Sequence, residues 1–359
     1  MTITYSKTPA PHSTQIDFIA DEAEFCASFS ERVSSHITQG ALIVTDKTIA
    51  ALPLFSKLTQ DVTDGKNTVL VLEAGEKHKT IENVLKIVSA ALEAGLGRKS
   101  TFVGIGGGVI CDMTSFAASI FKRGCIVELI PTTLLAMVDA AIGGKTACDV
   151  AHYKNMLGTF YPAQRITFFY GFLQTLDAIE YKSGLAEVIK TALLFDKDLT
   201  HFLQKKTIIA HNIPDSASSV LRSLIEPCVR AKAHIVEEDL TEQNIRMFLN
   251  FGHTFAHALE SVAGLGAVTH GEAVGWGIAR ALAFSVNEGL CSEEYRAQAC
   301  SLLLSYGFET EAAHSALKNM DGDARKNALI AVMRHDKKNT TKITDSTIKS
   351  LRSADYATR

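Results

Sequence analysis

The chain has 359 residues, a length that corresponds to about two domains. Hydrophobic residues make up 47% and charged residues 21%, a composition typical of folded globular proteins and not of disordered ones. The 36 Lys and Arg residues against 39 Asp and Glu residues give a net charge of −3, so no basic excess indicates a nucleic-acid or anionic-membrane partner.

Targeting and redox signals are also absent from the sequence. No apolar run is long enough for a transmembrane helix, and the N-terminus lacks the apolar segment of a secretory signal. The seven cysteines form no CxxC pair, which indicates reduced thiols and neither a disulfide framework nor a cysteine zinc site. We therefore expect a cytoplasmic protein with no membrane and no nucleic-acid partner.

The first half of the chain alternates between strand and helix patterns. Short apolar runs predict strands over 41–46, 67–76, 101–108 and 125–133. Helical spacing of apolar residues predicts helices over 80–96 and from about Asp112 to Gly124. Strand, helix and strand at this spacing predict a parallel sheet with crossover helices.

After about residue 178 the pattern changes to helices. Apolar residues recur at helical spacing over 184–194, 218–238, 252–263, 272–289 and 294–307, and strand patterns are almost absent. We expect a domain boundary there, with an α/β domain over 1–178 and an all-helical domain over 179–359.

Two glycine-rich turns could hold an anionic group. Gly106, Gly107 and Gly108 follow a predicted strand and precede a helix, where backbone N–H groups can approach a phosphate. They do not complete G-x-G-x-x-G, because Val109 stands at the third glycine position. Gly143 and Gly144 lead into Lys145, but the outer glycine of a Walker A motif is replaced by Asp139. An ordinary turn without a ligand, and a solvated lysine in the second case, are the alternatives.

Glutamate and histidine residues of the second half indicate a metal site. Glu187 and Lys190 share a helix face; their apolar neighbours favour burial, although a surface ion pair is the alternative. His253 and His257 are four residues apart, and His270 starts the next predicted helix. Spacing alone predicts that His253 and His257 both bind zinc, with an open position for substrate. By composition, the segment RHDKKN (334–339) is a basic helix end on the surface.

These segments together resemble the 3-dehydroquinate synthase family, from about Asp46 to about Lys338. The resemblance rests on their order, which is specific as a set: GEKHK, GGGVICD, IPTTLLAMVDAAIGGKT, KNMLGTFY, SGLAEVIK, RMFLNFGHTFAHALE, HGEAVGWG and HDKK. It implies a Rossmann-like α/β N-terminal domain followed by an all-α metal-binding C-terminal domain.

The resemblance also implies which residues bind the cofactor, the metal ion and the substrate. The expected NAD contacts are Asp46, Glu76, Lys79, Gly107, Gly108, Asp112, Thr132, Thr133, Lys145, Lys154, Phe172 and Thr175. The expected ligands of a catalytic zinc ion, with Co²⁺ as an alternative, are Glu187, His253 and His270, so that His257 becomes a substrate contact. The remaining substrate or catalytic residues are Asp139, Lys145, Lys154, Asn155, Lys190, Lys232, Arg246, Asn250 and Lys337.

The implied reaction converts 3-deoxy-D-arabino-heptulosonate 7-phosphate to 3-dehydroquinate and phosphate. It belongs to the shikimate pathway of chorismate and aromatic amino acid biosynthesis, and the enzyme is a lyase that would act as a homodimer. NAD would accept a hydride and return it within one cycle. The alternatives are another sugar-phosphate cyclase such as 2-deoxy-scyllo-inosose synthase, a metal-dependent polyol dehydrogenase, and a non-enzymatic NAD-binding homologue. Lys145, Lys154 and Arg246 disfavour the dehydrogenase, because a small neutral alcohol needs no such cations.

Several positions depart from the family pattern. Cys111 stands where the pattern usually has glycine, and Ala147-Cys148-Asp149 stands where it usually has Gly-x-Asn. The segment after Lys338 is polar and ends early. If Lys337 is poorly anchored as a result, substrate affinity would suffer.

Overall fold

The computed structural model describes residues 13–35, 39–60, 67–151, 153–205, 218–264 and 266–335. The chain separates into two compact units, unit 1 (Met1–Thr175) and unit 2 (Leu176–Arg359). The helices of unit 2 begin with α6 (Ala178–Phe195), and the domain boundary expected at residue 178 stays a prediction.

Unit 1 is built on a parallel sheet. Within the described residues, six strands pair in the order β1-β8-β5-β4-β2-β3, and every pairing between them is parallel. The strands are β1 (Gln15–Ile19), β2 (Ala41–Asp46), β3 (Thr68–Leu72), β4 (Thr101–Gly106), β5 (Ile126–Pro131) and β8 (Arg165–Phe169). β2 and β4 are buried almost throughout, as strands covered on both faces must be. The predicted parallel sheet is thus confirmed, although β1 and β8 were not predicted.

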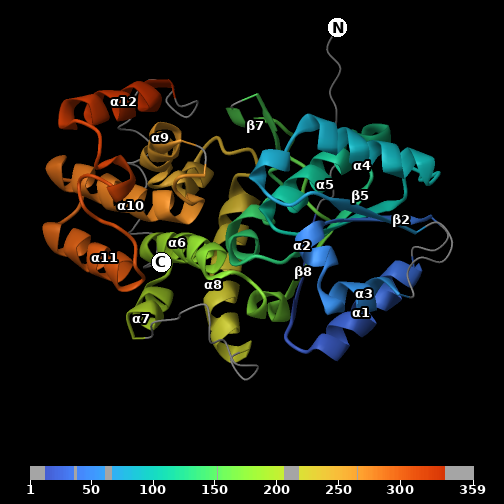
Figure 1. Cartoon of the computed structure of the whole chain (residues 1–359). Coiled ribbons are helices and arrows are strands. Elements are labelled where there is room, and N and C mark those ends of the chain that lie inside the picture. Colours follow the sequence, from blue (N-terminus) through green and yellow to red (C-terminus); the bar gives the residue numbers. More distant parts are fainter. Residues whose placement is uncertain are drawn as a thin grey trace, which may run out of the picture. The chain divides into compact units, whose positions relative to one another are not determined.

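Helices cover both faces of this sheet. Figure 1 shows α4 (Ile81–Glu93) and α5 (Gly108–Ile120) on one face, and α1 (Glu22–Ser35) and α3 (Pro53–Thr59) on the other. The short α2 (Lys47–Ala50) follows β2 directly. Crossover helices between parallel strands explain the predicted alternation of the sequence.

The turn from β4 into α5 is tighter than the sequence predicts. The helix begins at Gly108 and not near Asp112, and Cys111 N–H donates to Gly107 O at 3.0 Å as its first turn forms. A Cβ at Gly106 would lie 2.6 Å from the Cβ of Ile110. Only glycine therefore lets the strand pass directly into the helix, and this shortens the turn by a full helical turn relative to the prediction.

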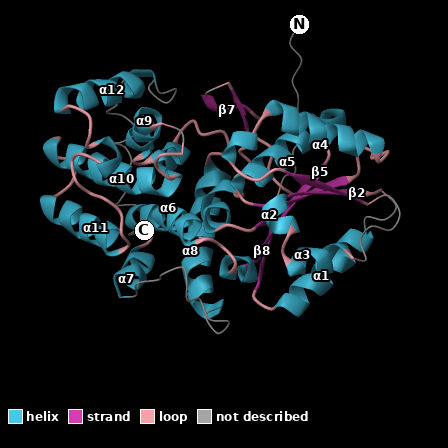
Figure 2. Ribbon diagram, viewed as in Figure 1, coloured by secondary structure: helices cyan, strands magenta, loops and turns pink. Residues whose placement is uncertain are grey.

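A separate hairpin follows β5. β6 (Cys148–Val150) and β7 (Tyr153–Leu157) pair antiparallel with a register irregularity, and Figure 2 shows them apart from the main sheet. A π-helical turn, Ala136–Ala140, precedes this hairpin, and a 3₁₀ segment, Tyr170–Gln174, follows β8. The sequence patterns did not predict the hairpin.

Unit 2 is helical, and no strand occurs in its described residues. After α6 come α7 (Lys197–Lys205), α8 (Ser218–Glu238), α9 (His253–Ala263), α10 (His270–Asn287), α11 (Glu293–Ser305) and α12 (Gly322–His335). α10 packs against α6, α9 and α11, as Figure 1 shows. In the parts of the chain that the structure describes, no helix combines the length and apolar character needed to cross a bilayer.

Candidate active site

The first residues expected to hold NAD follow two central strands of unit 1. β2 ends at Asp46, and β4 ends at Gly106, directly before Gly107 and Gly108. The strand order changes direction between β2 and β4, and open parallel sheets bind ligands where the order changes in this way. The N-terminus of α5 at this point offers backbone N–H groups and a positive dipole end. Asp46 Oδ1 accepts N–H groups of α2 at 2.9 and 3.1 Å, which fixes this carboxylate.

Lys79 and Asp112 form a buried ion pair nearby. Lys79 Nζ lies 2.6 Å from Asp112 Oδ2, and the two side chains are 6% and 15% exposed. Burial works against the charged form of Lys79, but the carboxylates of Asp112, Glu76 and Asp149 outweigh it and raise the pKa of Lys79. Lys79 is therefore a permanent cation, and Asp112 on α5 holds it beside the glycine turn.

The other predicted cofactor residues of unit 1 occupy turns. Glu76 begins the 3₁₀ turn Glu76–His78. Thr132 is buried, and its N–H donates to Gly106 O at 3.0 Å. Thr133 Oγ1 accepts the N–H of Ala136 at 3.2 Å. The Thr132 bond ties the end of β5 to the end of β4 at the glycine turn. The Thr133 bond fixes the turn that follows β5.

Phe172 and Thr175 lie in the segment that follows β8. The Phe172 ring is 2% exposed. It lies edge-on to Phe25, with centroids 5.9 Å apart, and to Phe169, at 5.6 Å. Thr175 Oγ1 donates to Phe172 O at 3.0 Å. The ring of Phe172 thus packs in an aromatic cluster with Phe25 and Phe169. The cofactor contact that the family resemblance implies for Phe172 stays a prediction.

The predicted substrate residues of unit 1 lie on and before the hairpin. Asp139 is half-buried in the π-helical turn, and Lys145 forms an antiparallel bridge with Phe160. Lys154 and Asn155 are exposed on β7. Asn155 Oδ1 accepts a hydrogen bond from Lys79 Nζ at 2.6 Å. The structure therefore brings one predicted substrate residue into contact with one predicted cofactor residue.

Unit 2 contains a candidate metal centre. Among the described residues, Glu187, His253 and His270 each offer one ligand atom, and these atoms lie within 4.8 Å of one another. Glu187 Oε1 is 3.6 Å from His253 Nε2 and 3.7 Å from His270 Nε2. Two imidazole nitrogens and one carboxylate oxygen match the donor set of catalytic zinc sites, which keep a position open for substrate. The residues present thus fit a zinc or cobalt ion.

This group differs from the one that histidine spacing predicts. His257 is not a member; its ring is perpendicular to that of His253, with centroids 5.6 Å apart. The group is the one implied by the family resemblance. The i,i+4 rule places two histidines on one face of α9, but α6 and α10 supply the other ligand atoms, and local spacing contains no information on helix packing.

The second ring nitrogen of each histidine also faces an oxygen. His253 Nδ1 lies 3.4 Å from Phe251 O, and His270 Nδ1 lies 3.7 Å from Glu260 Oε1. Such partners orient metal-ligating imidazoles and raise their basicity. Burial lowers the pKa of His270, but the Glu187 and Glu260 carboxylates more than reverse this and raise the pKa to about 9.

Unit 2 also buries three of the predicted substrate cations. Lys190 pairs with Glu187 Oε2, and each side chain is 2% exposed. Lys190 Nζ also donates to Leu249 O at 2.6 Å, which fixes its position. Lys232 on α8 is buried, and Arg246 is 0% exposed. Three of the cations expected to bind the substrate's anionic groups are thus buried in unit 2, and Lys190 lies directly beside a candidate metal ligand.

The loop before α9 orders Arg246 and Asn250. Asp239 accepts backbone N–H groups at 2.7 to 3.2 Å, those of Gln243, Asn244 and Arg246. The Arg246 guanidinium donates to Leu240 O, and Asn250 Nδ2 donates to Glu242 Oε1 at 2.5 Å. Two acidic residues of this loop thus hold the backbone of one predicted substrate residue and the side chain of the other.

Sequence reasoning missed Glu260 and Asp239. Glu260 stands seven residues after His253, two helical turns along the same face, and this periodicity could have identified it. Asp239 directly follows the helix predicted over 218–238 and precedes a polar loop, which is a usual place for a carboxylate that accepts backbone N–H groups. Lys337 and the rest of the segment after His335 lie outside the described residues.

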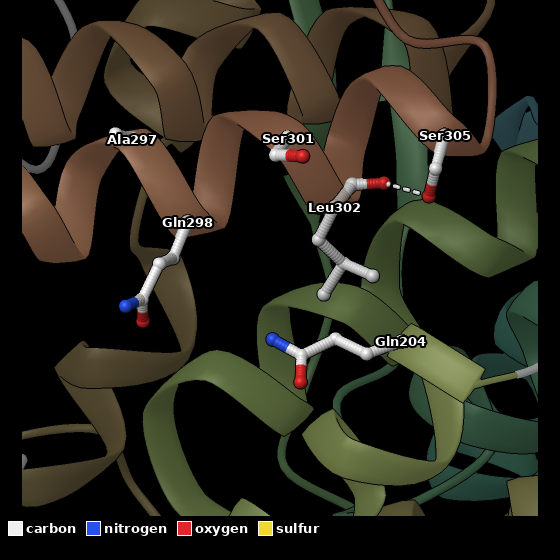
Figure 3. Close-up of a pocket in the computed structure, with 6 residues that line it drawn as sticks. All are labelled: Gln204, Ala297, Gln298, Ser301, Leu302 and Ser305. Atoms are coloured by element: carbon white, nitrogen blue, oxygen red, sulfur yellow. Dashed lines mark hydrogen bonds between the residues drawn. The ribbon is translucent and has the colours of Figure 1, made fainter.

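A surface pocket on α7 and α11 has different chemistry. Figure 3 shows its lining side chains, which are Gln204, Ala297, Gln298, Ser301, Leu302 and Ser305. Ser305 Oγ donates to Leu302 O at 2.7 Å. No predicted site residue lines this pocket, and it has no cation to balance a phosphate or a carboxylate.

Comparisons with known proteins agree with the resemblance. Family models for the 3-dehydroquinate synthase N-terminal and C-terminal domains match residues 69–183 and 184–339. A curated 3-dehydroquinate synthase from Desulforamulus reducens is 38% identical over 273 residues, which are 75% of each chain. That from Dichelobacter nodosus is 42% identical over 261 residues, or 73% of this chain and 70% of the other.

Solved structures show the same fold. A 2-epi-5-epi-valiolone synthase from Streptomyces hygroscopicus with NAD⁺ and Zn²⁺ bound has a TM-score of 0.79 at 25% identity, covering 99% of this chain and 98% of the other. A 2-deoxy-scyllo-inosose synthase complexed with carbaglucose-6-phosphate, NAD⁺ and Co²⁺ has a TM-score of 0.75 at 20% identity, covering 94% and 96%. The predicted fold class, a Rossmann-like α/β domain followed by a helical domain, is confirmed. By the extent of its similarity to the curated enzymes, the chain belongs to the 3-dehydroquinate synthase family.

Proposed function

We propose that this protein converts 3-deoxy-D-arabino-heptulosonate 7-phosphate to 3-dehydroquinate and inorganic phosphate, a carbon–oxygen lyase reaction of the shikimate pathway. Its family membership supports the reaction. The observation that carries the proposal is the group of Glu187, His253 and His270 with the buried cation Lys190 beside it. This group combines metal ligands with a fixed positive charge.

We assign the cofactors to the two units separately. Unit 1 would hold NAD at the glycine turn of α5, with Asp46 and Lys79, and unit 2 would hold Zn²⁺ or Co²⁺. When bound, NAD would accept and return a hydride, and the metal ion would polarise the substrate oxygens that react. The likeness to a synthase with NAD⁺ and Zn²⁺ bound supports both cofactors.

The chain's own side chains would bind and orient the substrate. Its carboxylate and phosphate need cations, which Lys145, Lys154, Lys190, Lys232 and Arg246 would supply. Lys190 is held between Glu187 and Leu249 O, so its charge is fixed before substrate arrives. A cation fixed beside the candidate metal ligand Glu187 would stabilise negative charge on a substrate oxygen without reorganisation. Asp139, Asn155, Asn250 and His257 would orient hydroxyl and phosphate groups by hydrogen bonds.

We also propose that the protein acts in the cytoplasm as a homodimer. No disulfide joins the seven cysteines, all of which lie in described parts of the chain, and reduced cysteines fit a reducing compartment. Light scattering on the purified protein would test the dimer, which predicts about twice the chain mass of 38.8 kDa.

The decisive experiment measures phosphate release from the heptulosonate phosphate by protein supplied with NAD and zinc. Added dehydroquinase must consume the product, and no net NADH must accumulate. The matched control is Glu187→Gln, which removes one metal-ligand charge at nearly constant shape. Release from another heptulose phosphate or a hexose phosphate only would favour a different sugar-phosphate cyclase, and NADH accumulation with glycerol would favour a polyol dehydrogenase.

A further inference from the structure

The hairpin β6–β7 is attached to the cofactor segment through Asp149. The backbone N–H of Asp149 donates to Lys79 O at 2.7 Å, and Asp149 pairs in parallel with Thr80 in an isolated bridge. Its side-chain Oδ1 accepts the N–H of Asn155 at 2.7 Å. Asp149 therefore contacts Lys79 through its backbone and Asn155 through its carboxylate.

Asn155 closes the connection. Its Oδ1 accepts from Lys79 Nζ at 2.6 Å, so a closed cycle of hydrogen bonds runs from Lys79 to Asp149, from Asp149 to Asn155, and from Asn155 back to Lys79. Lys79 Nζ also forms an ion pair with Asp112 Oδ2 at 2.6 Å. None of the three residues can move far unless a bond of the cycle breaks.

The backbone of Asn155 requires such support. Its φ is +54°, in the left-handed region that non-glycine residues occupy only at a cost, although asparagine tolerates it better than most. The carboxylate of Asp149 accepts the N–H of this same residue, so it stabilises the left-handed conformation directly. This conformation directs the Asn155 amide towards Lys79.

We propose that Asp149 is a positioning residue that holds Asn155 in its substrate-binding conformation and links it to Lys79 in the cofactor segment. The reading of Asn155 as a substrate contact and Lys79 as a cofactor contact rests on the proposed function. Asp149 itself touches neither ligand; it acts through Asn155. Asparagine, which the family pattern usually has at this position, offers an amide oxygen that can accept the same N–H, so the bond and not the charge is the essential feature.

A double-mutant cycle tests this role. Asp149→Ala and Asn155→Ala are each expected to raise KM for the heptulosonate phosphate about tenfold with little change in kcat, the effect of one lost hydrogen bond to a polar substrate. The double variant should be no worse than Asn155→Ala alone, because Asp149 acts through Asn155. Asp149→Asn should restore KM to within about twofold of the original protein.

The matched control is Asp21→Ala. Asp21 also accepts a backbone N–H through its carboxylate, that of Glu24 at 2.8 Å, but it lies at the start of α1. Its loss should leave KM unchanged. Additive effects of the Asp149 and Asn155 substitutions on KM, or a failure of Asp149→Asn to restore it, would overturn the proposal.

Hydrogen exchange separates this proposal from the proposed function. In protein without substrate or cofactors, Asp149→Ala should accelerate amide exchange in peptides that contain Asn155, and Asp21→Ala should not. If the unmodified protein releases no phosphate, the proposed function fails while the exchange result still reports on the hydrogen-bond cycle. Unchanged exchange at Asn155 would contradict the structural basis of the proposal whatever the enzyme activity.

Discussion

The hydroxyl oxygen of Ser183 accepts a hydrogen bond from the backbone N–H of Gly271 at 2.9 Å. This N–H belongs to the first turn of α10, where helical N–H groups have no partner within the helix. Ser183 lies one turn before Glu187 on α6, and Gly271 follows His270. The bond therefore joins the two helices beside two of the candidate metal ligands.

Removal of this bond should weaken metal binding. Ser183→Ala leaves a buried N–H without its acceptor, so zinc affinity should fall about fivefold to tenfold. Gly271→Ala should have a larger effect, because its Cβ would lie 2.2 Å from Ser183 Cα; overpacking of this kind costs about 1–3 kcal/mol. Competition with a chromophoric chelator measures the affinity. Gly322→Ala is the control, since its Cβ would meet nothing closer than 4.0 Å, and equal losses in both glycine variants would exclude the packing explanation.

The Lys190–Glu187 pair should matter most in protein without metal. Lys190→Met removes the cation on Glu187 Oε2 and leaves only His270 to compensate this buried carboxylate, so the free energy of unfolding should fall by up to about 3–5 kcal/mol. Added zinc should recover part of this loss, because the ion supplies the missing positive charge. Denaturant titrations with and without zinc measure both effects. Arg296→Met, which breaks an exposed ion pair on α11, should cost well under 1 kcal/mol. If zinc did not change the free energy of unfolding of the Lys190→Met variant, the proposed metal centre would be contradicted.

Metal affinity should depend on pH through His270. The raised pKa of about 9 means that His270 carries a proton at neutral pH in metal-free protein, and zinc must displace it. Zinc affinity should therefore rise about tenfold per pH unit between pH 7 and about 9. The same proton stabilises the metal-free fold: this contribution is complete below the unfolded pKa of about 6.5 and is lost as pH rises through about 9.

Glu260→Gln tests the cause of this pH dependence. The substitution removes one of the two carboxylates that raise the pKa of His270, so the affinity should level off at a lower pH. At high pH, where the proton no longer competes, zinc affinity should still fall about tenfold or more, because the partner that orients the imidazole is weakened. Calorimetry in buffers of different ionisation enthalpy counts the protons released. An unchanged proton release in the variant would show that Glu260 does not act on His270.

Asp239 should control both stability and substrate binding. Burial works to raise its pKa, but backbone N–H groups of the following loop outweigh burial and hold the pKa below its ordinary value. Its contribution to stability is therefore present at neutral pH and is lost as pH falls below about 4. Asp239→Ala should cost about 1–3 kcal/mol and raise KM through the displaced Arg246. When the unfolding midpoint is measured at decreasing pH, stability should fall less in this variant than in the original protein. An unchanged KM would show that Asp239 does not act on the substrate site.

Most of the α/β architecture could be predicted from local patterns. The run ALIVTD becomes β2 with its predicted bounds, because a buried parallel strand is apolar at nearly every position. β1 could not be predicted in this way. Its sequence QIDFI is half polar, and it becomes a strand because β8 lies beside it, with Gln15 opposite Arg165. Pairings over such sequence distances leave no local periodicity.

The candidate site shows the same limit at the level of side chains. The composition and spacing around His253 indicated metal chemistry, but they selected His257 as its partner ligand. Glu187 and His270 join His253 only because α6, α9 and α10 pack together. The family resemblance supplied this packing information in advance, since the order of whole segments reflects a complete fold and spacing within one helix does not.

The position of β1 has a consequence for synthesis of the protein. β1 lies at one edge of the sheet, and in the described structure its strand partner is β8, 150 residues later in the chain. While the ribosome translates the residues between them, the first strand has left the exit tunnel without the neighbour that completes its backbone hydrogen bonds. β1 can join the sheet only once residues 165–169 have emerged from the ribosome. Until then chaperones can bind the unpaired first strand.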